Sequence, residues 1–181
     1  QLLVLGALIY YMGTRHFLGH RFDWRFWGWI MAGSTMVFVV LTYWFPSYTL
    51  RVGFFTVLMG CIYVAQLRFM LRQGDRSFPV RLVQVVLAVH TLVLAVRLTS
   101  ILIGKGGSDL MEPSLFQTLY IGAYVLMVLM LSIGAVLMAT DRLRTELEHL
   151  ATHDSLTNTL NRRALLARCE DELERAQRYG H

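Results

Sequence analysis

The sequence predicts an all-α protein: a polytopic bundle of membrane-spanning helices, then a short helix that leaves the membrane, then one further amphipathic helix. The chain of 181 residues is 55% hydrophobic and only 16% charged, whereas about 25% of the residues of a soluble domain are charged. Apolar blocks of about 20 residues, long enough to cross a hydrocarbon layer of about 30 Å, recur up to residue 139. A large soluble core is the alternative, but so many consecutive apolar blocks make it strained.

Five apolar segments can be drawn, over residues 2–13, 26–45, 52–71, 82–103 and 115–139. The first is shorter than a span requires, so we expect the native chain to extend upstream and the parent to have five or, more in keeping with the pattern, seven spans. In the second segment, Trp27 and Trp44 stand about 26 Å apart along a helix. This separation matches the aromatic belts of the two membrane interfaces. Pro46 should end that helix.

The positions of the arginines predict how the chain is oriented. The net charge of +5 comes almost entirely from arginine, because Lys105 is the only lysine. The first loop holds Arg15, Arg21 and Arg25, and the third loop with its flank holds Arg68, Arg72, Arg76 and Arg81. Cytoplasmic loops are enriched in positive residues, so we place loops one and three and the C-terminal tail in the cytoplasm. This topology, in a bacterial inner membrane, explains the basic charge without a nucleic-acid partner.

Two ionisable residues stand inside the fourth apolar segment. His90 and Arg97 are seven residues apart, so they share one helix face about two turns apart. Ionisable groups at this depth are costly and mark functional sites, which makes both candidate contacts for an anionic or polar ligand. The alternative is that Arg97 snorkels to the interface and that His90 stays neutral with one hydrogen-bond partner. The polar residues that could partner them are Tyr63, Gln66, Gln84 and Gln117.

No metal site is expected within these residues. Cys61 and Cys169 follow neither a metal-ligand spacing nor a disulfide pattern, so we expect reduced thiols. His16 and His20 could bind a metal together if helical, but only Asp23 offers a nearby carboxylate. A solvated loop, or one that faces lipid headgroups, is the simpler interpretation.

A second apolar pattern crosses the point at which the chain becomes polar. Alternating three- and four-residue steps join Ile133, Val136, Thr140, Leu143, Leu147 and Leu150. Such spacing forms the a/d seam of a parallel two-helix coiled coil, which would make a second copy of the chain a partner. Arg142–Glu146 and Arg144–Glu148 would add i,i+4 ion pairs on the outer face. A merely amphipathic helix next to the membrane is the alternative.

After the seam, the chain reads His153-Asp154-Ser155-Leu156-Thr157-Asn158-Thr159-Leu160-Asn161-Arg162-Arg163. This stretch resembles the opening of GGDEF domains, D-x-L-T-G-L-x-N-R-R, which directly follows a signalling helix. The residues that carry the resemblance are Asp154, Leu156, Thr157, Leu160, Asn161, Arg162 and Arg163, with Leu160 one position after the second leucine of the motif. Asn158 replaces the usual glycine, and asparagine also tolerates a positive φ. Asn161 can cap the next helix, and the resemblance implies a salt bridge from Asp154 to an arginine of the Asn161-Arg162-Arg163 group.

The resemblance implies an organisation into three parts: a transmembrane sensor domain over residues 1–139, a coiled-coil signalling helix over 140–153 and the N-terminal piece of a GGDEF domain over 154–181. The parent would be a diguanylate cyclase that joins two GTP into cyclic di-GMP. It would act as a homodimer because the active site is shared, with Mg²⁺ bound beyond His181. No catalytic residue is expected in this chain, since Gly106-Gly107-Ser108-Asp109 lies in a predicted external loop.

Two other interpretations remain. A degenerate GGDEF domain would bind nucleotide or relay a signal without catalysis, and the downstream Gly-Gly-Asp/Glu-Glu-Phe loop would distinguish it from an enzyme. A sensor histidine kinase would place His153 in a helix followed by an Arg-Thr-Pro-like stretch, which is absent. The sensed ligand is unknown, and the sequence does not choose among lipid, small molecule, ion or membrane state.

Overall fold

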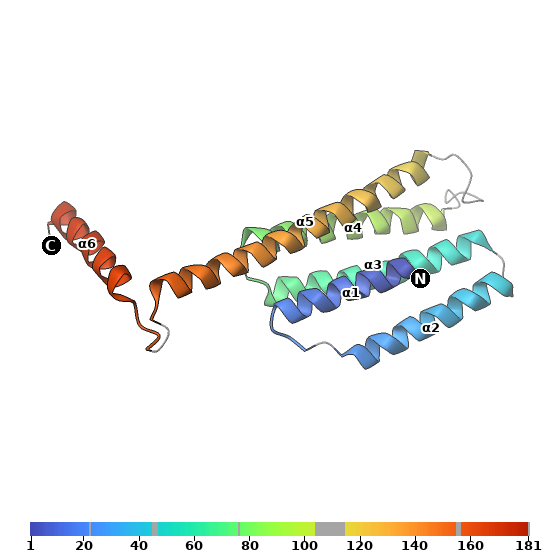
Figure 1. Ribbon diagram of the computed structural model, residues 1–181. Coiled ribbons are helices and arrows are strands. Elements are labelled where there is room, and N and C mark those ends of the chain that lie inside the picture. Colours follow the sequence, from blue (N-terminus) through green and yellow to red (C-terminus); the bar gives the residue numbers. More distant parts are fainter. Residues whose placement is uncertain (22, 45–46, 76, 104–114, 155–156, 181) are drawn as a thin grey trace. The chain divides into compact units, whose positions relative to one another are not determined.

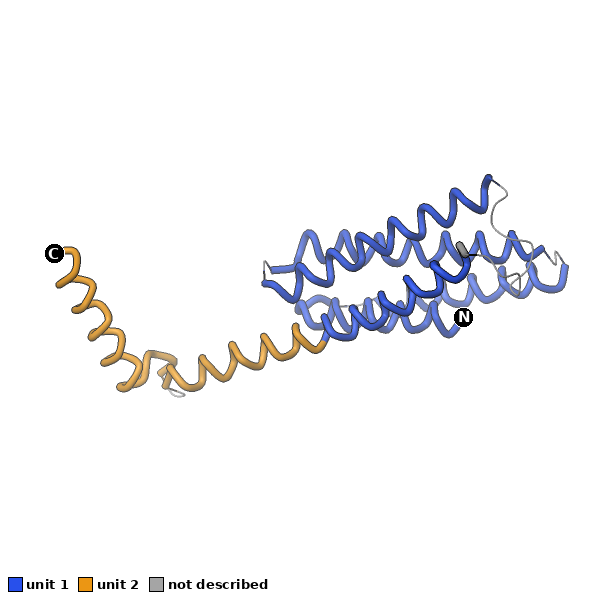
Figure 2. The backbone as a smooth tube through the Cα atoms, turned by 90° about the horizontal axis from the view of Figure 1, so that it is seen from above, with its two compact units in different colours: residues 1–135 blue, residues 136–181 orange. Residues whose placement is uncertain are grey.

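The computed structural model describes residues 1–181 except 22, 45–46, 76, 104–114, 155–156 and 181. The described residues form six α-helices and no β-strand (Figure 1), which confirms the predicted all-helical fold. They divide into two compact units, Gln1–Ala135 and Val136–His181 (Figure 2).

The first unit contains α1 (Leu2–Phe17), α2 (Trp24–Tyr43), α3 (Tyr48–Gln73), α4 (Phe78–Leu102) and the first part of α5 (Leu115–Thr152). Among the described helices, α2 to α5 are each long and apolar enough to cross a membrane. The 16 residues of α1 reach about 24 Å, in keeping with a first segment that is short for a span. Helix α1 continues four residues past the predicted end at Gly13, because polar residues such as Thr14 still support helical hydrogen bonding.

Helix α3 is the centre of the first unit. It packs against α1, α2 and α4, and most extensively against α4. Most buried residues of this helix pair follow alternating steps of three and four: Thr56, Met59, Tyr63, Gln66 and Met70 in α3, and Val80, Val83, Leu87, His90 and Leu94 in α4. Ile62 and Pro79 are buried beside them. Such spacing is typical of knobs-into-holes packing between helices that cross at a shallow angle.

The turn between α3 and α4 is tight and requires a small residue at Gly74. A Cβ there would lie 2.5 Å from the Met70 carbonyl oxygen and 2.8 Å from a methyl carbon of Val80. The Gln84 Nε2 donates to the same Met70 carbonyl at 2.9 Å. The end of α3 and the start of α4 are therefore fixed to each other by packing and by a side-chain hydrogen bond.

Helix α5 approaches α1 and α4 through small or polar groups. The Tyr10 hydroxyl of α1 donates to the Leu131 carbonyl oxygen at 3.0 Å, and a Cβ added at Gly134 would collide with the Val83 side chain. Small residues that let backbones approach, together with interhelical hydrogen bonds, are the means by which helices associate in lipid.

The outward faces of these helices are apolar. The exposed large side chains include Met36, Val37, Val39, Val85, Val89, Leu92, Val96, Val125 and Leu129. A soluble monomer rarely exposes such a continuous apolar surface, whereas a bilayer accommodates it. Trp24 and Trp29 near one end of α2, and Tyr43 and Trp44 at the other, are also exposed, as expected of interfacial aromatic belts.

The second unit contains the remainder of α5 and α6 (Arg162–Tyr179). With 38 residues, α5 is about 57 Å long, so the predicted fifth membrane segment and the predicted signalling helix form one continuous helix. Helix α6 ends at Gly180, whose φ of 71° lies in the left-handed region that glycine adopts without steric cost at a helix C-terminus.

Candidate functional site

His90 lies in a polar cluster inside the first unit. Its side chain is 2% exposed and its ring makes edge-to-face contacts with Tyr63 of α3 and Tyr124 of α5, at centroid distances of 5.3 Å and 5.7 Å. Tyr63 and Tyr124 also interact with each other. His90 Nε2 is buried and has no hydrogen-bond partner among the described residues. Three helices therefore meet at a histidine that keeps one nitrogen available.

Arg97 lies about two turns further along α4 and stacks on Tyr120 of α5. The central guanidinium carbon is 3.5 Å from the centroid of the Tyr120 ring. This is a close cation–π contact, and such contacts strengthen when water is excluded. Arg97 is half-buried, so the stacking holds its charge between α4 and α5.

Arg97 also lines a cavity of about 630 Å³, within the range of about 300–1,000 Å³ typical of small-molecule pockets. All five helices of the unit contribute to its wall, which consists of Gln1, Leu3 from α1, Phe38 from α2, Tyr48, Arg51, Val52 and Phe55 from α3, Arg97 from α4, and Gln117, Tyr120, Ile121 and Tyr124 from α5. Five of these twelve residues are aromatic. Arg51 adds a second guanidinium, whose buried Nε has no hydrogen-bond partner in the described part of the chain.

The structure separates the two ionisable residues that the sequence singled out. Arg97 is on the cavity wall, whereas His90 is not among the residues that line this cavity. Tyr124 connects them, because it lines the cavity and packs against the His90 ring. Of the proposed polar partners, Gln117 lines the cavity beside Arg97 and Tyr63 contacts His90.

The other two proposed partners have structural roles. Gln66 is fully buried in α3, and its Nε2 donates to the Thr14 hydroxyl of α1 at 3.4 Å. Gln84 closes the turn between α3 and α4, as described above. Both join neighbouring helices, and neither is among the residues that line the cavity of Arg97.

Sequence reasoning missed Arg51 as a site residue, because Arg51 was considered only as the positive charge of a predicted external loop. The positions of Arg51 and Arg97 within the apolar segments could have indicated the site. Arg51 stands near the start of one apolar segment and Arg97 near the end of the next, so an alternating topology brings both to the same side of the membrane. Tyr120 and Tyr124 are four residues apart and therefore share one face of α5.

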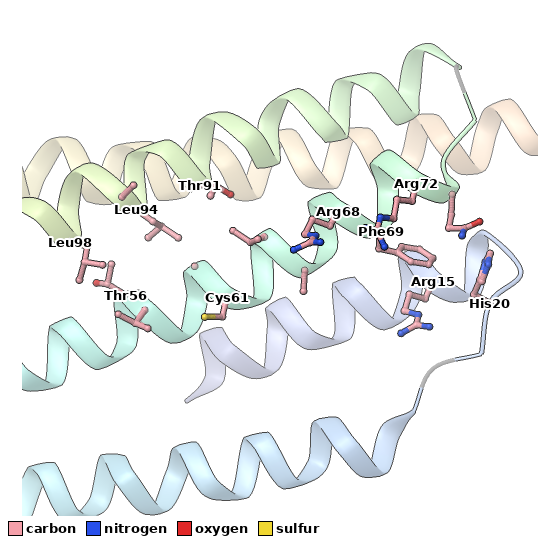
Figure 3. A pocket seen from close by; sticks show the side chains of 16 residues that line it. Arg15, His20, Thr56, Cys61, Arg68, Phe69, Arg72, Thr91, Leu94 and Leu98 are labelled. Carbon is pink, nitrogen blue, oxygen red and sulfur yellow. The ribbon is translucent and has the colours of Figure 1, made fainter.

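A second cavity, of about 870 Å³, lies along α3 and α4 (Figure 3). At one end it is lined by Arg15, His20, Arg68 and Arg72, and further along by Cys61, Leu94 and Leu98 (Figure 3). Arg68 and Arg72 are exposed, and long cationic side chains at a helix end lay their stems on apolar surface and their charge among lipid headgroups. This arrangement is typical of a lipid-facing groove.

In the second unit, Asn161 holds the joint between α5 and α6. Its Oδ1 accepts a hydrogen bond from the backbone of Ala164 at 2.9 Å, and its Nδ2 donates to the Ala151 carbonyl at 2.8 Å. Its backbone N–H donates to Thr152 at 2.8 Å. The predicted helix cap is therefore confirmed, and the same residue also binds the last turn of α5.

Asp154 organises the turn before this cap. Its Oδ1 accepts from the backbone N–H of Thr157 at 3.0 Å and from the Thr157 hydroxyl at 3.2 Å. Asn158 has a φ of 53°, so it adopts the left-handed conformation that asparagine was expected to tolerate at this turn. The salt bridge from Asp154 to Arg162 or Arg163 stays a prediction, and Leu156 lies outside the described residues.

The residues of the predicted coiled-coil seam lie on a solvent- or lipid-accessible surface of the single chain. The exposed fractions are 47% for Ile133, 65% for Val136, 60% for Leu143, 65% for Leu147 and 65% for Leu150, and Thr140 is also exposed. Of the two expected i,i+4 pairs, Arg144–Glu148 forms, with 2.8 Å between Nε and Oε1. The seam is thus a regular apolar stripe whose side chains are exposed among the residues that the structure describes.

No protein-family model, no curated protein and no solved structure matches the chain. Within the described residues, no three or more His, Cys, Asp or Glu side chains form a group that could hold a metal ion.

Proposed function

We propose that this chain is the membrane sensor region and signalling helix of a diguanylate cyclase, with the first residues of its GGDEF domain at the C-terminal end. The transmembrane character of four helices supports the sensor part. The apolar stripe on α5 supports a parallel homodimer, because burial of such a seam is the usual reason for its spacing. The arginine-rich loops support a cytoplasmic C-terminus in a bacterial inner membrane.

One observation carries the proposal: six residues match the opening of a GGDEF domain position for position, and Leu160 lies one position after its second leucine. This stretch directly follows a long helix that continues from the membrane bundle. The local geometry suits this assignment, since Asn161 caps α6 and Asn158 takes the left-handed conformation. The hydrogen bonds of Asn161 to both helices would make the joint stiff enough to pass a movement of α5 to the domain that follows.

By the same resemblance, each of two GGDEF domains presents one GTP. The 3′-hydroxyl of each GTP attacks the α-phosphate of the other, so that two phosphodiester bonds form and two pyrophosphates leave. Mg²⁺ would polarise the phosphate and neutralise developing charge, at residues beyond His181. This chain would hold the two GGDEF domains in a defined relative orientation, and that orientation would change when the membrane bundle binds its signal.

The histidine kinase alternative gains no support from the geometry around His153. This residue directly follows α5, which ends at Thr152, and it forms an isolated antiparallel bridge with Leu160. A phosphoacceptor histidine is instead expected on the exposed face of a helix.

The experiment is an assay of the full-length parent, purified in lipid nanodiscs and incubated with GTP and Mg²⁺. We expect cyclic di-GMP and pyrophosphate to accumulate, measured by liquid chromatography and mass spectrometry, and a sample with excess EDTA to form neither. GTP binding without product would favour the degenerate GGDEF domain that relays a signal. A parent that neither binds GTP nor forms the product would overturn both assignments.

A further inference from the structure

We propose that the cavity lined by Arg51 and Arg97 binds an amphipathic organic anion, with an acidic group between the two guanidiniums and an apolar body against the surrounding rings. Such an anion would be the class of signal that the sensor detects. That its binding regulates cyclic di-GMP synthesis rests on the proposed cyclase function, whereas the binding itself does not.

Among the described residues, the charge of the cavity is not balanced. Both guanidiniums face one cavity, and none of the described residues that line it is acidic. Two like charges in a medium of low dielectric constant repel each other much more strongly than in water, and Nε of Arg51 is buried without a partner. An anion between Arg51 and Arg97 would relieve the repulsion and supply the missing acceptor.

The orientation of Arg97 suits a planar acid. Its central guanidinium carbon lies over the Tyr120 ring, 3.5 Å from the centroid, so one side of the group is in contact with the ring. The N–H donors lie in the guanidinium plane, where arginine forms paired hydrogen bonds with carboxylates and phosphates. Arg51 stands in the first turn of α3, where the positive end of the helix dipole adds to the attraction for an anion.

The rest of the wall selects for an apolar body. Phe38, Tyr48, Phe55, Tyr120 and Tyr124 present rings to the cavity, and aromatic walls favour flat or chain-like apolar groups. An inorganic anion alone would leave most of this space without contacts. An acid with an apolar body satisfies both parts of the wall.

The ligand has two possible sources. Arg51 and Arg97 lie next to the loops that the arginine distribution places outside the cell. A water-soluble aromatic acid could enter from the external medium, and a fatty acid could enter from the outer leaflet. The chemistry of recognition is the same for both.

Occupancy of the cavity would bear directly on α5. Tyr120 and Tyr124 belong to this helix, and Tyr124 also contacts His90. The same helix continues into the apolar stripe that contains Leu143 and Leu147. A ligand that prefers one position of α5 would shift the population of that position.

The test measures binding to the purified full-length protein in nanodiscs, by isothermal titration calorimetry and by ligand-induced thermal stabilisation. The probes are 2-naphthoate, its neutral analogue 2-naphthamide, and decanoate as a chain-like acid. We expect at least one acid to bind and the amide to bind at least about tenfold more weakly, the difference that a lost charge-assisted hydrogen bond produces. Preference for 2-naphthoate would indicate a soluble source, and preference for decanoate a lipid source.

The variants are R97Q and R51Q, with R68Q as the matched control, because Arg68 is on the same helix as Arg51 but lines the other cavity. We expect R97Q and R51Q each to weaken acid binding about tenfold or more, R68Q to leave it unchanged, and R97K to restore part of it. Circular dichroism and the melting temperature without ligand confirm that each variant is folded.

Equal affinity for acid and amide, an equal loss in R68Q, or no binding of either acid would overturn the proposal. Neither readout needs cyclase activity. If the protein binds the acids and makes no cyclic di-GMP, the binding site stands and the proposed cyclase function is wrong. If it makes cyclic di-GMP and binds neither acid, the cyclase function stands and the binding site is wrong.

Discussion

The side chain of Asn161 holds both sides of the joint between the two helices of the second unit. Its carbonyl caps α6 and its amide group donates to the last turn of α5. The two roles can be separated by mutation, since aspartate keeps the acceptor of the cap and loses the donor to Ala151.

We expect Asn161→Ala to destabilise the start of α6 by about 0.5–2 kcal/mol, the usual cost of a lost helix cap. Asn161→Asp should retain the cap and loosen only the connection to α5. Hydrogen exchange of the backbone amides measures both effects: the alanine variant should exchange faster at Ala164, the aspartate variant should not. Equal protection of Ala164 in all three proteins would show that the side chain does not cap the helix.

Gly74 marks the closest approach in the turn between α3 and α4. A Cβ at this position meets a backbone oxygen at 2.5 Å and Val80 at 2.8 Å, and a backbone atom cannot move aside as a side chain can. We expect Gly74→Ala to destabilise the first unit by about 1–3 kcal/mol, as overpacked sites do. Gly60→Ala in the same helix is the control, because a Cβ there has no neighbour within 4 Å. The melting temperatures of the two variants in nanodiscs would contradict this expectation if they were equal.

Single residues also show what the sequence could and could not indicate. The cap at Asn161 and the left-handed Asn158 follow from local backbone chemistry, so they could be predicted. Arg51 could not be assigned to a cavity in the same way, because its neighbours come from other helices. In a membrane, the helix face that packs on other helices and the face that contacts lipid are both apolar, so hydropathy does not distinguish them. In α4, for example, Val83 is buried and Val89 is exposed.

At the scale of elements, the sequence located the described helices, but α3 and α4 begin before the predicted apolar segments, at Tyr48 and Phe78 and not at residues 52 and 82. Hydropathy changes at Ala139, and α5 continues to Thr152, as the apolar pattern that crosses this point indicated. Composition reports where a chain leaves the membrane, and helical hydrogen bonding does not have to stop at that point. This continuity matters because it makes the apolar stripe part of the same helix as Tyr120 and Tyr124.

The stripe on α5 should be the contact surface of two parallel chains. Cysteine at Leu147 should form an interchain disulfide in membranes of a variant that lacks Cys61 and Cys169, because seam residues face their counterparts across a dimer. Cysteine at Glu146, one residue away, points about 100° around the helix and is the matched control. Non-reducing gel electrophoresis measures the yield of dimer. Equal yields at Leu147 and Glu146 would rule out the seam.

The packing of this stripe should also set the output. Two leucines per heptad contribute about 1.5–3 kcal/mol each on burial, and the entropy lost in ordering the helix offsets part of this gain. Two arrangements of the proposed dimer would therefore differ little in free energy. Replacing Leu143 and Leu147 with glutamine, or inserting one residue after Leu150 to rotate the next domain by about 100°, should change cyclic di-GMP output in the parent severalfold. Membrane insertion should not change. Parental output in both variants would mean that the helix is a passive tether.

At the scale of the molecule, the sequence predicted an all-helical chain with long apolar segments, and the structure has both. The arrangement of the helices around α3 was not predictable, because interhelical contacts such as Tyr10 with Leu131 and Gln66 with Thr14 depend on pairs far apart in the chain. The orientation of the bundle in the membrane is predicted from the charges of the loops and not from the packing of the helices.

The orientation can be tested with reporter fusions. The arginines near Gln73 and the lack of arginine around Gly106 predict that a fusion at Gln73 lies in the cytoplasm and one at Gly106, which is outside the described residues, lies on the external side. β-Galactosidase should therefore be active at Gln73 and alkaline phosphatase at Gly106, with the exchanged reporters as controls for expression. The reverse pattern would place α6 outside the cell, away from GTP, and would turn the cavity of Arg51 and Arg97 towards the cytoplasm. The proposed cyclase function would then be excluded, because a domain that consumes GTP requires the cytoplasmic side.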